Sequence, residues 1–278
     1  MTIDGLRASI ERLAASSSPD RDEARAAVDA LLTALEEGAV RAAEPGPDGW
    51  TVNTWVKRGL LLAFRCGVNV GLAVPPFHFR DRDTLPTQDP SRGGRNVRVV
   101  PGGSTVRRGA FLAEGVVVMP PAFVNVGAHV GAGTMIDSHA LVGSCAQIGA
   151  HVHLSAAVQV GGVLEPPGAM PVIVEDHAFV GGGCGLYEGT RVGSRAVLAP
   201  GVVLTRALTL YDAAHGRSIV VDGSGVLVVP ERAVVVPGSR PATGDWARSK
   251  GLALYAPVIV KYRDAATDAA AALEEALR

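Results

Sequence analysis

An aliphatic residue recurs at every sixth position through the middle of the chain. The row runs without a miss through Val106, Leu112, Val118, Val124, Val130, Ile136, Val142, Ile148, Leu154 and Val160. It is interrupted at residues 161–173 and resumes in a new frame at Val174, Val180, Leu186, Val192, Leu198, Leu204 and Leu210. Neither a helix nor an ordinary strand has this period, but a short strand followed by a turn does. Since three such strands form one coil, the spacing predicts a left-handed parallel β-helix with its aliphatic residues stacked inward.

The position after each aliphatic residue is mostly small or short. It is occupied by Asn125, Gly131, Asp137, Gly143, Gly149, Ser155 and Gly161. Such residues suit a corner of the prism, where a Cβ atom is crowded. The alternative interpretation is an irregular β-sandwich with coincidental spacing. In the β-helix, residues 161–173 would form a loop pushed out of one corner, and functional residues tend to lie on such loops.

The chain before the prism has a helical pattern. Apolar residues at three- and four-residue steps predict two helices within residues 1–40, separated at Ser16–Asp20. Gly46–Gly49 is expected to turn, and Trp55–Arg65 returns to helical spacing. The exposed face of that helix is expected to carry Lys57, Arg58 and Arg65. Residues 75–98 show no period, which predicts an irregular connection.

The end of the chain is expected to form a short strand and a helix. Trp246–Lys250 is interpreted as a loop and Ala256–Val260 as a strand. Asp264–Arg278 is Ala-rich and predicts a helix, with Asp264 or Thr267 as its N-cap. The mainly β chain thus divides into a helical domain with its connection (1–98), a β-helix (99–240) and a strand/helix segment (241–278).

Composition narrows the range of partners. The chain has 278 residues and a net charge of −1, which argues against a nucleic-acid surface or a polybasic membrane surface. Its 3 cysteines are too few and too far apart for a disulfide framework or a thiolate metal site. It has no apolar run of about 18 residues and no signal-peptide core. We therefore expect a cytoplasmic protein without membrane, nucleic-acid or metal partners.

A prism of this kind has flat, partly apolar faces, so a homotrimer is its usual form. The grooves between neighbouring prisms are long and narrow, and they suit the extended pantetheine arm of coenzyme A. Gly181-Gly182-Gly183 lacks the lysine and the strand–helix context of a phosphate loop, and is interpreted as a corner.

Several motifs together resemble the tetrahydrodipicolinate N-succinyltransferase family of hexapeptide acyltransferases. The central ones are Met119-Pro120, Asn125–Ala128, Gly133–Asp137, Val142–Gly149, His151–Ser155 and Gly161–Pro166. Flanking ones are Trp55–Arg58, Phe64-Arg65, Val106–Phe111 and Leu254–Lys261. The resemblance covers most of residues 50–263. It implies a trimer that transfers a succinyl group from succinyl-CoA to the amine of a ring-opened dicarboxylic substrate; acetyl-CoA remains open as the acyl donor.

Asp137 is the first catalytic candidate. An amine that attacks a thioester must lose a proton, and a positioned carboxylate can accept it. Asp137 stands where the family has its catalytic aspartate, which implies a general base or a group that orients the amine; the alternative is a polar corner residue. His139 replaces the family's tryptophan. Because alternate strand positions share a face, an Asp137–His139 pair is a hypothesis, and a histidine that merely fills space is the alternative.

The chain departs from the family pattern around the second catalytic carboxylate. The family's arginine falls on Gly183 and its catalytic glutamate on Gly185, while a later glutamate survives as Glu188 and is taken as the third catalytic candidate. A pair of glycines becomes Ala156-Ala157, and another glycine becomes Gln159. Because these changes cluster at one pocket, two acceptors stay open: an amino-dicarboxylate such as tetrahydrodipicolinate, or another amino acid of a specialised pathway.

The resemblance also implies binding residues. For the substrate they are Arg107, Asn125, Ser144 and Cys184. For coenzyme A they are Gly238, Ser239, Arg240, Pro241, Lys250 and Lys261. Arg107 would pair with a carboxylate. The alternative for Cys184 is a small buried residue, and Cys145 is interpreted as an interior packing residue.

Two rival functions remain. A γ-type carbonic anhydrase shares the prism and binds zinc through histidines, and the candidates would be His129, His139, His151, His153 and His177. Of these, His151 and His153 are expected to share a strand face. The other rival is a non-catalytic hexapeptide trimer, suggested by the loss of the carboxylate at Gly185. A zinc assay tests the first, and a thiol-release assay tests the second.

Overall fold

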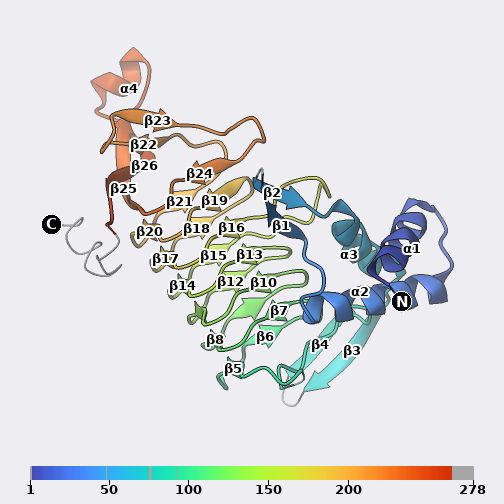
Figure 1. Ribbon diagram of the computed structural model, residues 1–278. Coiled ribbons are helices and arrows are strands. Elements are labelled where there is room, and N and C mark those ends of the chain that lie inside the picture. The colour runs from blue at the N-terminus through green and yellow to red at the C-terminus, as the bar shows by residue number, and fades with distance from the viewer. Residues whose placement is uncertain (1, 48, 75–76, 92, 265–278) are drawn as a thin grey trace.

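The computed structural model describes residues 2–47, 49–74, 77–91 and 93–264. Its centre is a three-sided prism of two- and three-residue strands, with the helices against one side and a long hairpin at the far end (Figure 1). The predicted fold class, a left-handed parallel β-helix with an N-terminal helical domain, is confirmed.

Each face of the prism is a parallel sheet whose neighbouring strands come from successive coils. The first face holds β5 (Arg98–Val99), β8 (Val117–Val118), β11 (Met135–Ile136), β14 (His153–Leu154), β17 (Phe179–Val180) and β20 (Val197–Leu198). The second holds β6 (Thr105–Val106), β9 (Phe123–Val124), β12 (Leu141–Val142), β15 (Gln159–Val160), β18 (Gly185–Leu186) and β21 (Val203–Leu204). The third holds β7 (Phe111–Leu112), β10 (His129–Val130), β13 (Gln147–Ile148), β16 (Ile173–Val174), β19 (Thr190–Val192) and β24 (Leu227–Val229).

The six-residue row of aliphatic side chains forms the core of the prism. Ile136 pairs with Val118 in the coil before and with Leu154 in the coil after, and all three are fully buried. Every later member of the row to Leu210 is buried in the same cluster. The stacking of equivalent residues therefore holds successive coils in register.

The corners reverse the chain through a residue with positive φ. We call the corner between the first and second faces the first corner (as at 137–140), the next the second corner (143–146) and the last the third corner (149–152). Such residues include His139 at φ 63° and His151 at φ 53°. Just after β10, a Cβ atom on Gly131 would lie 2.4 Å from the carbonyl carbon of Gly149, so only glycine allows the next coil this close. Residues 161–173 leave the second corner as the predicted loop, without a strand before β16.

The N-terminal domain consists of α1 (Ile3–Ala15), α2 (Arg21–Glu36) and α3 (Thr54–Cys66), as the apolar spacing predicts. Thr2 and Asp20 cap the first two helices with their side chains. The expected exposed face of α3 is wrong at one position. Lys57 is fully buried, because this face of the helix is covered by residues 161–173 of the prism.

Two hairpins join the helices to the prism. The predicted turn at Gly46–Gly49 connects β1 (Ala43–Gly46) with β2 (Gly49–Val52). The interpretation of residues 75–98 as irregular is wrong in part, because β3 (Asn69–Val74) pairs with β4 (Phe77–Arg82). Asp83, directly after β4, bonds Arg25 of α2 at 2.8 Å and so ties this hairpin to the helices.

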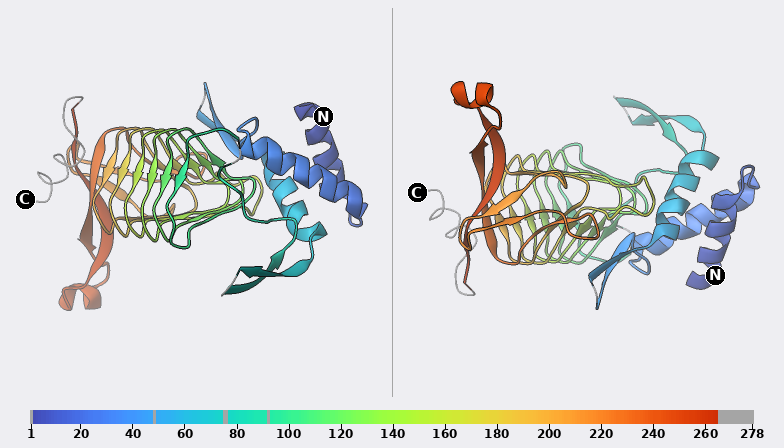
Figure 2. Two further views of the ribbon diagram at one scale, coloured as in Figure 1. Left: turned by 90° about the horizontal axis from the view of Figure 1, so that it is seen from below. Right: turned by 90° about the horizontal axis from the view of Figure 1, so that it is seen from above.

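The C-terminal part caps the prism. β22 (Leu210–Asp212) pairs with β23 (Arg217–Ile219), and β25 (Ala233–Pro241) pairs with β26 (Ala253–Tyr262) as a long hairpin that extends beyond the outline of the coils (Figure 2). The expected strand lies within β26. The expected loop at its tip is wrong, because α4 (Asp245–Ser249) forms there. The helix expected at Asp264–Arg278, with its N-cap at Asp264 or Thr267, lies outside the described residues beyond Asp264. Among the helices that the structure describes, none combines the length and apolar character of a membrane span.

Candidate functional site

Asp137 lies at the first corner, directly after β11, and is half-buried. One of its carboxylate oxygens accepts a hydrogen bond from the backbone N–H of Ser138 at 2.7 Å. Asn125 makes the same contact with Val126 at the second corner, at 2.8 Å. An amide therefore satisfies this corner as well as a carboxylate does, and the corner geometry alone does not require the negative charge of Asp137.

His139 is exposed on the same corner but does not pair with Asp137. Its φ of 63° places it in the turn rather than on a strand, so the hypothesis that the two residues share a strand face is wrong. Its N–H donates to the carbonyl of Pro121 at 2.6 Å. Within the described chain, no hydrogen bond or ion pair joins the side chains of Asp137 and His139. The imidazole therefore points from the corner to solvent.

The altered residues of the sequence meet on the second face. Gln159 of β15 lies in register beside Gly185 of β18, and its amide donates to the carbonyl of His139 at 3.2 Å. A Cβ atom on Gly185 would lie 2.7 Å from the ring of Tyr187, so this ring occupies the space that a side chain at 185 would need. The structure thus identifies Tyr187, which the sequence analysis did not select, as the residue that fills the changed pocket.

Glu188 lies at the second corner. Its carboxylate forms an ion pair with Arg206 at 3.4 Å, and both side chains are largely exposed to solvent. Glu188 is therefore on the surface, at the opposite edge of the second face from Asp137.

The expected substrate residues Arg107, Asn125 and Ser144 also lie at the second corner. The guanidinium of Arg107 is engaged by the connecting segment, because it contacts the carboxylate of Asp81 at 2.5 Å and the carbonyl of Leu85 at 2.5 Å. The structure therefore gives Arg107 a role in holding this segment to the first coil. A bound carboxylate would have to share Arg107 with Asp81.

The loop at 161–173 is held on both sides. The N–H of Val163 donates to the carbonyl of Ser144 at 3.1 Å, and the ammonium of Lys57 donates to the carbonyl of Ala169 at 2.5 Å. Burial lowers the pKa of Lys57, and the nearby Cys145 and Glu188 oppose this shift. Sequence reasoning missed this residue, although its apolar neighbours Trp55 and Val56 were a signal that this turn of helix is covered.

The cysteines are packing residues. Cys184 lies inside the prism, where its thiol is 3.1 Å from the carbonyl of Ala199 and burial raises its pKa to about 11. This location agrees with the alternative of a small buried residue rather than with substrate contact. Burial raises the pKa of Cys145 to about 12. Cys145 packs under the helical domain, although we expected it inside the prism. Both thiols are therefore protonated at neutral pH.

The histidines lie in separate stacks. His151 at the third corner stacks on His177 at 5.1 Å, whereas His153 on β14 stacks on Phe179 at 5.1 Å. The expectation that His151 and His153 share a face is therefore wrong. Over the described ranges, the structure brings no three His, Cys, Asp or Glu side chains together in a way that suits a metal ion.

The residues expected to bind coenzyme A lie on the C-terminal hairpin. Gly238–Pro241 form the outer half of β25, Lys250 follows α4 at the tip, and Lys261 lies on β26 near the prism. The hydroxyl of Tyr255 on β26 contacts both backbone groups of Val203 on the second face, at 2.7 and 3.1 Å. The hairpin is thus anchored to the same face that carries Gly185.

A buried carboxylate holds the base of this hairpin. Asp212 accepts hydrogen bonds from Arg217 at 2.8 Å, from Tyr262 at 2.8 Å and from His215 at 3.0 Å. Burial alone would raise the pKa of Asp212, but these donors outweigh it and lower the pKa below its ordinary value of 3.8.

Apart from Cys184 and the residues of the C-terminal hairpin, the predicted site residues therefore form two groups in one chain. Asp137 and His139 lie at the first corner, and Asn125, Ser144 and Glu188 lie at the second. The second face, with Gln159, Gly185 and Tyr187, separates them.

The sequence of the chain is similar to those of known N-succinyltransferases over most of its length. A model described as the N-terminal domain of tetrahydrodipicolinate N-succinyltransferase matches residues 6–66, and one described as the hexapeptide repeat of succinyl-transferase matches residues 171–206. A 2,3,4,5-tetrahydropyridine-2,6-dicarboxylate N-succinyltransferase of Bordetella petrii is 44% identical over 259 residues, covering 92% of this chain and 90% of the relative. The enzyme of the same name from Parvibaculum lavamentivorans is 40% identical over the full length of both chains. Among solved structures, a hexapeptide-repeat acetyltransferase of Vibrio cholerae with acetyl coenzyme A is 19% identical, with a TM-score of 0.31 over 44% of this chain and 66% of that one.

Proposed function

The chain belongs to the tetrahydrodipicolinate N-succinyltransferase family, and from this premise we propose that it transfers a succinyl group from succinyl-CoA to the amine of an amino-dicarboxylate such as tetrahydrodipicolinate. The observation that carries the proposal is the extent of the relation: 44% identity over 92% of the chain includes the helical domain and the prism together. The reaction is an acyl transfer from coenzyme A.

The chemistry follows from the groups at the first corner. The amine nitrogen attacks the thioester carbonyl, the C–S bond breaks, and coenzyme A leaves as its thiol. Asp137 takes the proton that the amine loses and passes it to the leaving sulfur, or it holds the amine in the orientation for attack while this proton passes to the sulfur through solvent. An acyl-cysteine intermediate is disfavoured, because the described cysteines Cys66, Cys145 and Cys184 are all buried. The amine therefore attacks succinyl-CoA directly.

A homotrimer is part of the proposal. Asp137 and Glu188 lie at opposite edges of the second face, so one chain alone does not bring them together. A neighbouring copy would place its own corner against this face and enclose the groove for the pantetheine arm, with the hairpin residues Gly238–Pro241 over the nucleotide end. Sedimentation equilibrium tests this, with three chains per particle as the expected result and a monomer as the result against it.

The central test is an Asp137→Asn variant. The contact of Asn125 with its corner supports correct folding of the variant. We expect kcat for thiol release from succinyl-CoA to fall by about 10²- to 10⁴-fold while the Kd for coenzyme A is unchanged. The matched control is Asp222→Asn, because Asp222 accepts backbone hydrogen bonds from Ser224 and Val226 in a turn outside the site.

Two results would count against the proposal. Unchanged turnover in Asp137→Asn would remove the role of general base. Retained coenzyme A binding without thiol release, for any acyl donor and amine tried, would favour a non-catalytic trimer instead.

A second acceptor is favoured by one observation. Tyr187 fills the space beside Gly185, where the family pattern has a glutamate, so the pocket is less polar here than that pattern implies. We propose an amino acid with a less polar side chain as the alternative acceptor. A panel of amines at a fixed concentration of succinyl-CoA distinguishes the two acceptors by kcat/KM.

We also propose that the enzyme is located in the cytoplasm, because its described cysteines are unpaired. Cell fractionation tests this location.

A further inference from the structure

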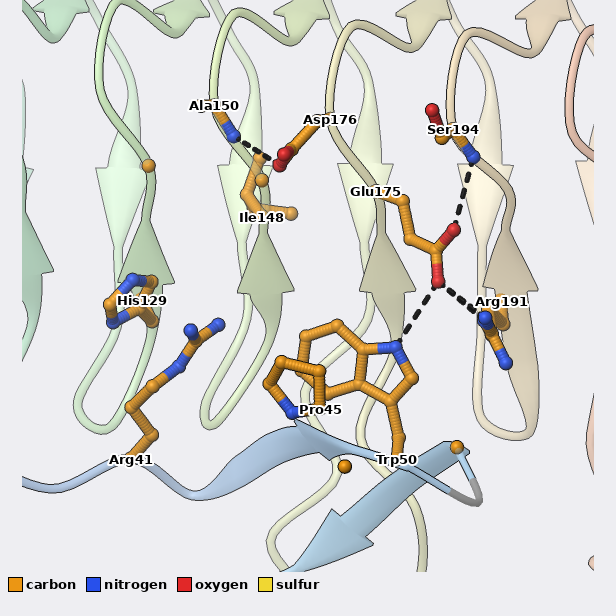
Figure 3. Close-up of a pocket in the computed structure, with 14 residues that line it drawn as sticks. Arg41, Pro45, Trp50, His129, Ile148, Ala150, Glu175, Asp176, Arg191 and Ser194 are labelled. Carbon is orange, nitrogen blue, oxygen red and sulfur yellow. Dashed lines mark hydrogen bonds and ion pairs between the residues drawn. The ribbon is translucent and has the colours of Figure 1, made fainter.

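A separate cavity lies between the β1–β2 hairpin and the third face of the prism. It has a volume of about 470 Å³ and is lined by Arg41, Pro45, Trp50, His129, Ile148 and Asp176, among others (Figure 3). The residues of the proposed acyl transfer lie at the first and second corners and on the second face. This cavity therefore has no part in that reaction.

A guanidinium forms one wall of the cavity. Arg41 donates through Nε to the side chain of Gln147 at 3.0 Å, and its guanidinium carbon lies 5.5 Å from the centre of the Trp50 ring. Its two terminal nitrogens have no hydrogen bond recorded within the described chain. Burial lowers the pKa of Arg41, but it stays charged at neutral pH. It therefore presents two partly desolvated donor groups, the arrangement that suits a carboxylate.

A carboxylate, that of Asp176, also lines this cavity (Figure 3). Asp176 accepts the N–H of Ala150 with one oxygen at 2.8 Å, and its side chain is otherwise exposed. The second acidic residue of the lining is already engaged. Glu175 accepts from Trp50 at 3.2 Å and from Arg191 at 2.7 Å. Asp176 is therefore the carboxylate that remains for a ligand.

Apart from Glu175 and Arg191, which are paired with each other, the rest of the lining is neutral. Desolvation and the charge of Arg41 lower the pKa of His129 to about 3, so its imidazole is uncharged at neutral pH. Its buried Nδ1 has no hydrogen-bond partner in the described chain. Trp50 and Pro45 add apolar surface, whereas the side chain of Ile148 is fully buried in the prism core. Besides the Arg191–Glu175 ion pair, the cavity thus offers one positive group, one negative group and an apolar wall.

We propose that this cavity binds a free aliphatic α-amino acid as its zwitterion. The carboxylate pairs with Arg41, the ammonium pairs with Asp176, and the side chain packs along Trp50 and Pro45. A ligand with only a negative charge would pair with Arg41 but would be repelled by Asp176. A ligand with only a positive charge would pair with Asp176 but would be repelled by Arg41. Only a ligand with both charges satisfies both walls.

The test is calorimetric titration of the full-length chain with three probes of one carbon skeleton. L-Norleucine carries both charges, hexanoate lacks the ammonium, and 1-pentylamine lacks the carboxylate. We expect norleucine to bind at least about tenfold more tightly than either of the others, because each lost ion pair costs a charged hydrogen bond. Equal binding of hexanoate, or no heat with norleucine up to about 10 mM, would overturn the proposal.

Variants locate the binding. Asp176→Asn keeps an oxygen for the N–H of Ala150 and removes only the charge, so its fold should be intact. Arg41→Gln removes the cation. Each should weaken norleucine at least about tenfold, whereas the control Arg98→Gln, on the exposed β5 edge, should not. Unweakened binding in Asp176→Asn would refute the assignment, whatever the outcome of Arg41→Gln.

Discussion

The contact between Gly185 and Tyr187 allows a quantitative test of the changed pocket. A Cβ atom on Gly185 would lie 2.7 Å from the Tyr187 ring, 0.7 Å inside the 3.4 Å at which ordinary contact begins. The ring is 42% exposed, so it can rotate away, and relief should cost about 1–2 kcal/mol rather than disrupt the strand. Replacement of glycine by alanine within a strand by itself stabilises the folded protein by about 0.5–1 kcal/mol.

A double-mutant cycle isolates the steric cost. Gly185→Ala alone should destabilise by about 1 kcal/mol, and in the Tyr187→Val background it should stabilise by about 0.5–1 kcal/mol. The gain from alanine is common to both backgrounds and cancels, which leaves a coupling of about 1–2 kcal/mol. Gly168→Ala is the control, because a Cβ atom there meets nothing within 4 Å.

Urea denaturation followed by circular dichroism measures the four free energies of unfolding. Additivity within about 0.5 kcal/mol would refute the claim that the ring fills this space. The functional counterpart is Gly185→Glu. It should raise kcat/KM for tetrahydrodipicolinate only when Tyr187→Val makes room, and an equal gain without Tyr187→Val would also contradict the geometry.

Three further predictions concern the scaffold. Gly131→Ala should destabilise by about 3 kcal/mol in urea, because its Cβ atom would lie 2.4 Å from backbone of the next coil. Asp212→Asn should make the free energy of unfolding depend less on pH in acid. The lowered pKa of this carboxylate stabilises the fold above about pH 3.8, and this stability is lost as the pH falls through the pKa of the folded state. The urea midpoint of the variant should therefore change less between about pH 5 and 2 than that of the unsubstituted protein. Lys57→Met should increase the rate of amide hydrogen exchange in residues 161–173 at least about tenfold, because the carbonyl of Ala169 loses its ammonium donor. Mass spectrometry measures this rate.

The prism was predictable because its core repeats a single local rule. Each sixth residue must be aliphatic to stack on its equivalents, so the row from Val106 to Leu210 predicts the positions of the strands directly. The helices α1 to α3 were predictable for a similar reason, since each buries one apolar stripe. In these parts local pattern and tertiary contact require the same residues.

The errors arise where tertiary contacts override local pattern. Lys57 reads as a surface residue from composition, but the extruded loop covers it and supplies a carbonyl for its charge. His139 follows a strand by three residues, and only the corner φ of 63° decides that it turns away from Asp137. The β3–β4 hairpin was missed although Val70, Leu72 and Val74 alternate along β3, because its strands are largely exposed and do not belong to the prism core.

The same distinction bears on how the acceptor of such an enzyme can change. A side chain at Gly131 would collide with backbone of the neighbouring coil, so the corner resists substitution whatever the substrate. At Gly185 the atoms nearest to an added Cβ belong to the partly exposed side chain of Tyr187. Substitutions on the outer surface of the second face therefore cost little stability, whereas substitutions at the corners displace a coil. The pocket beside Asp137 can consequently diverge in charge and shape while the prism that positions it stays the same.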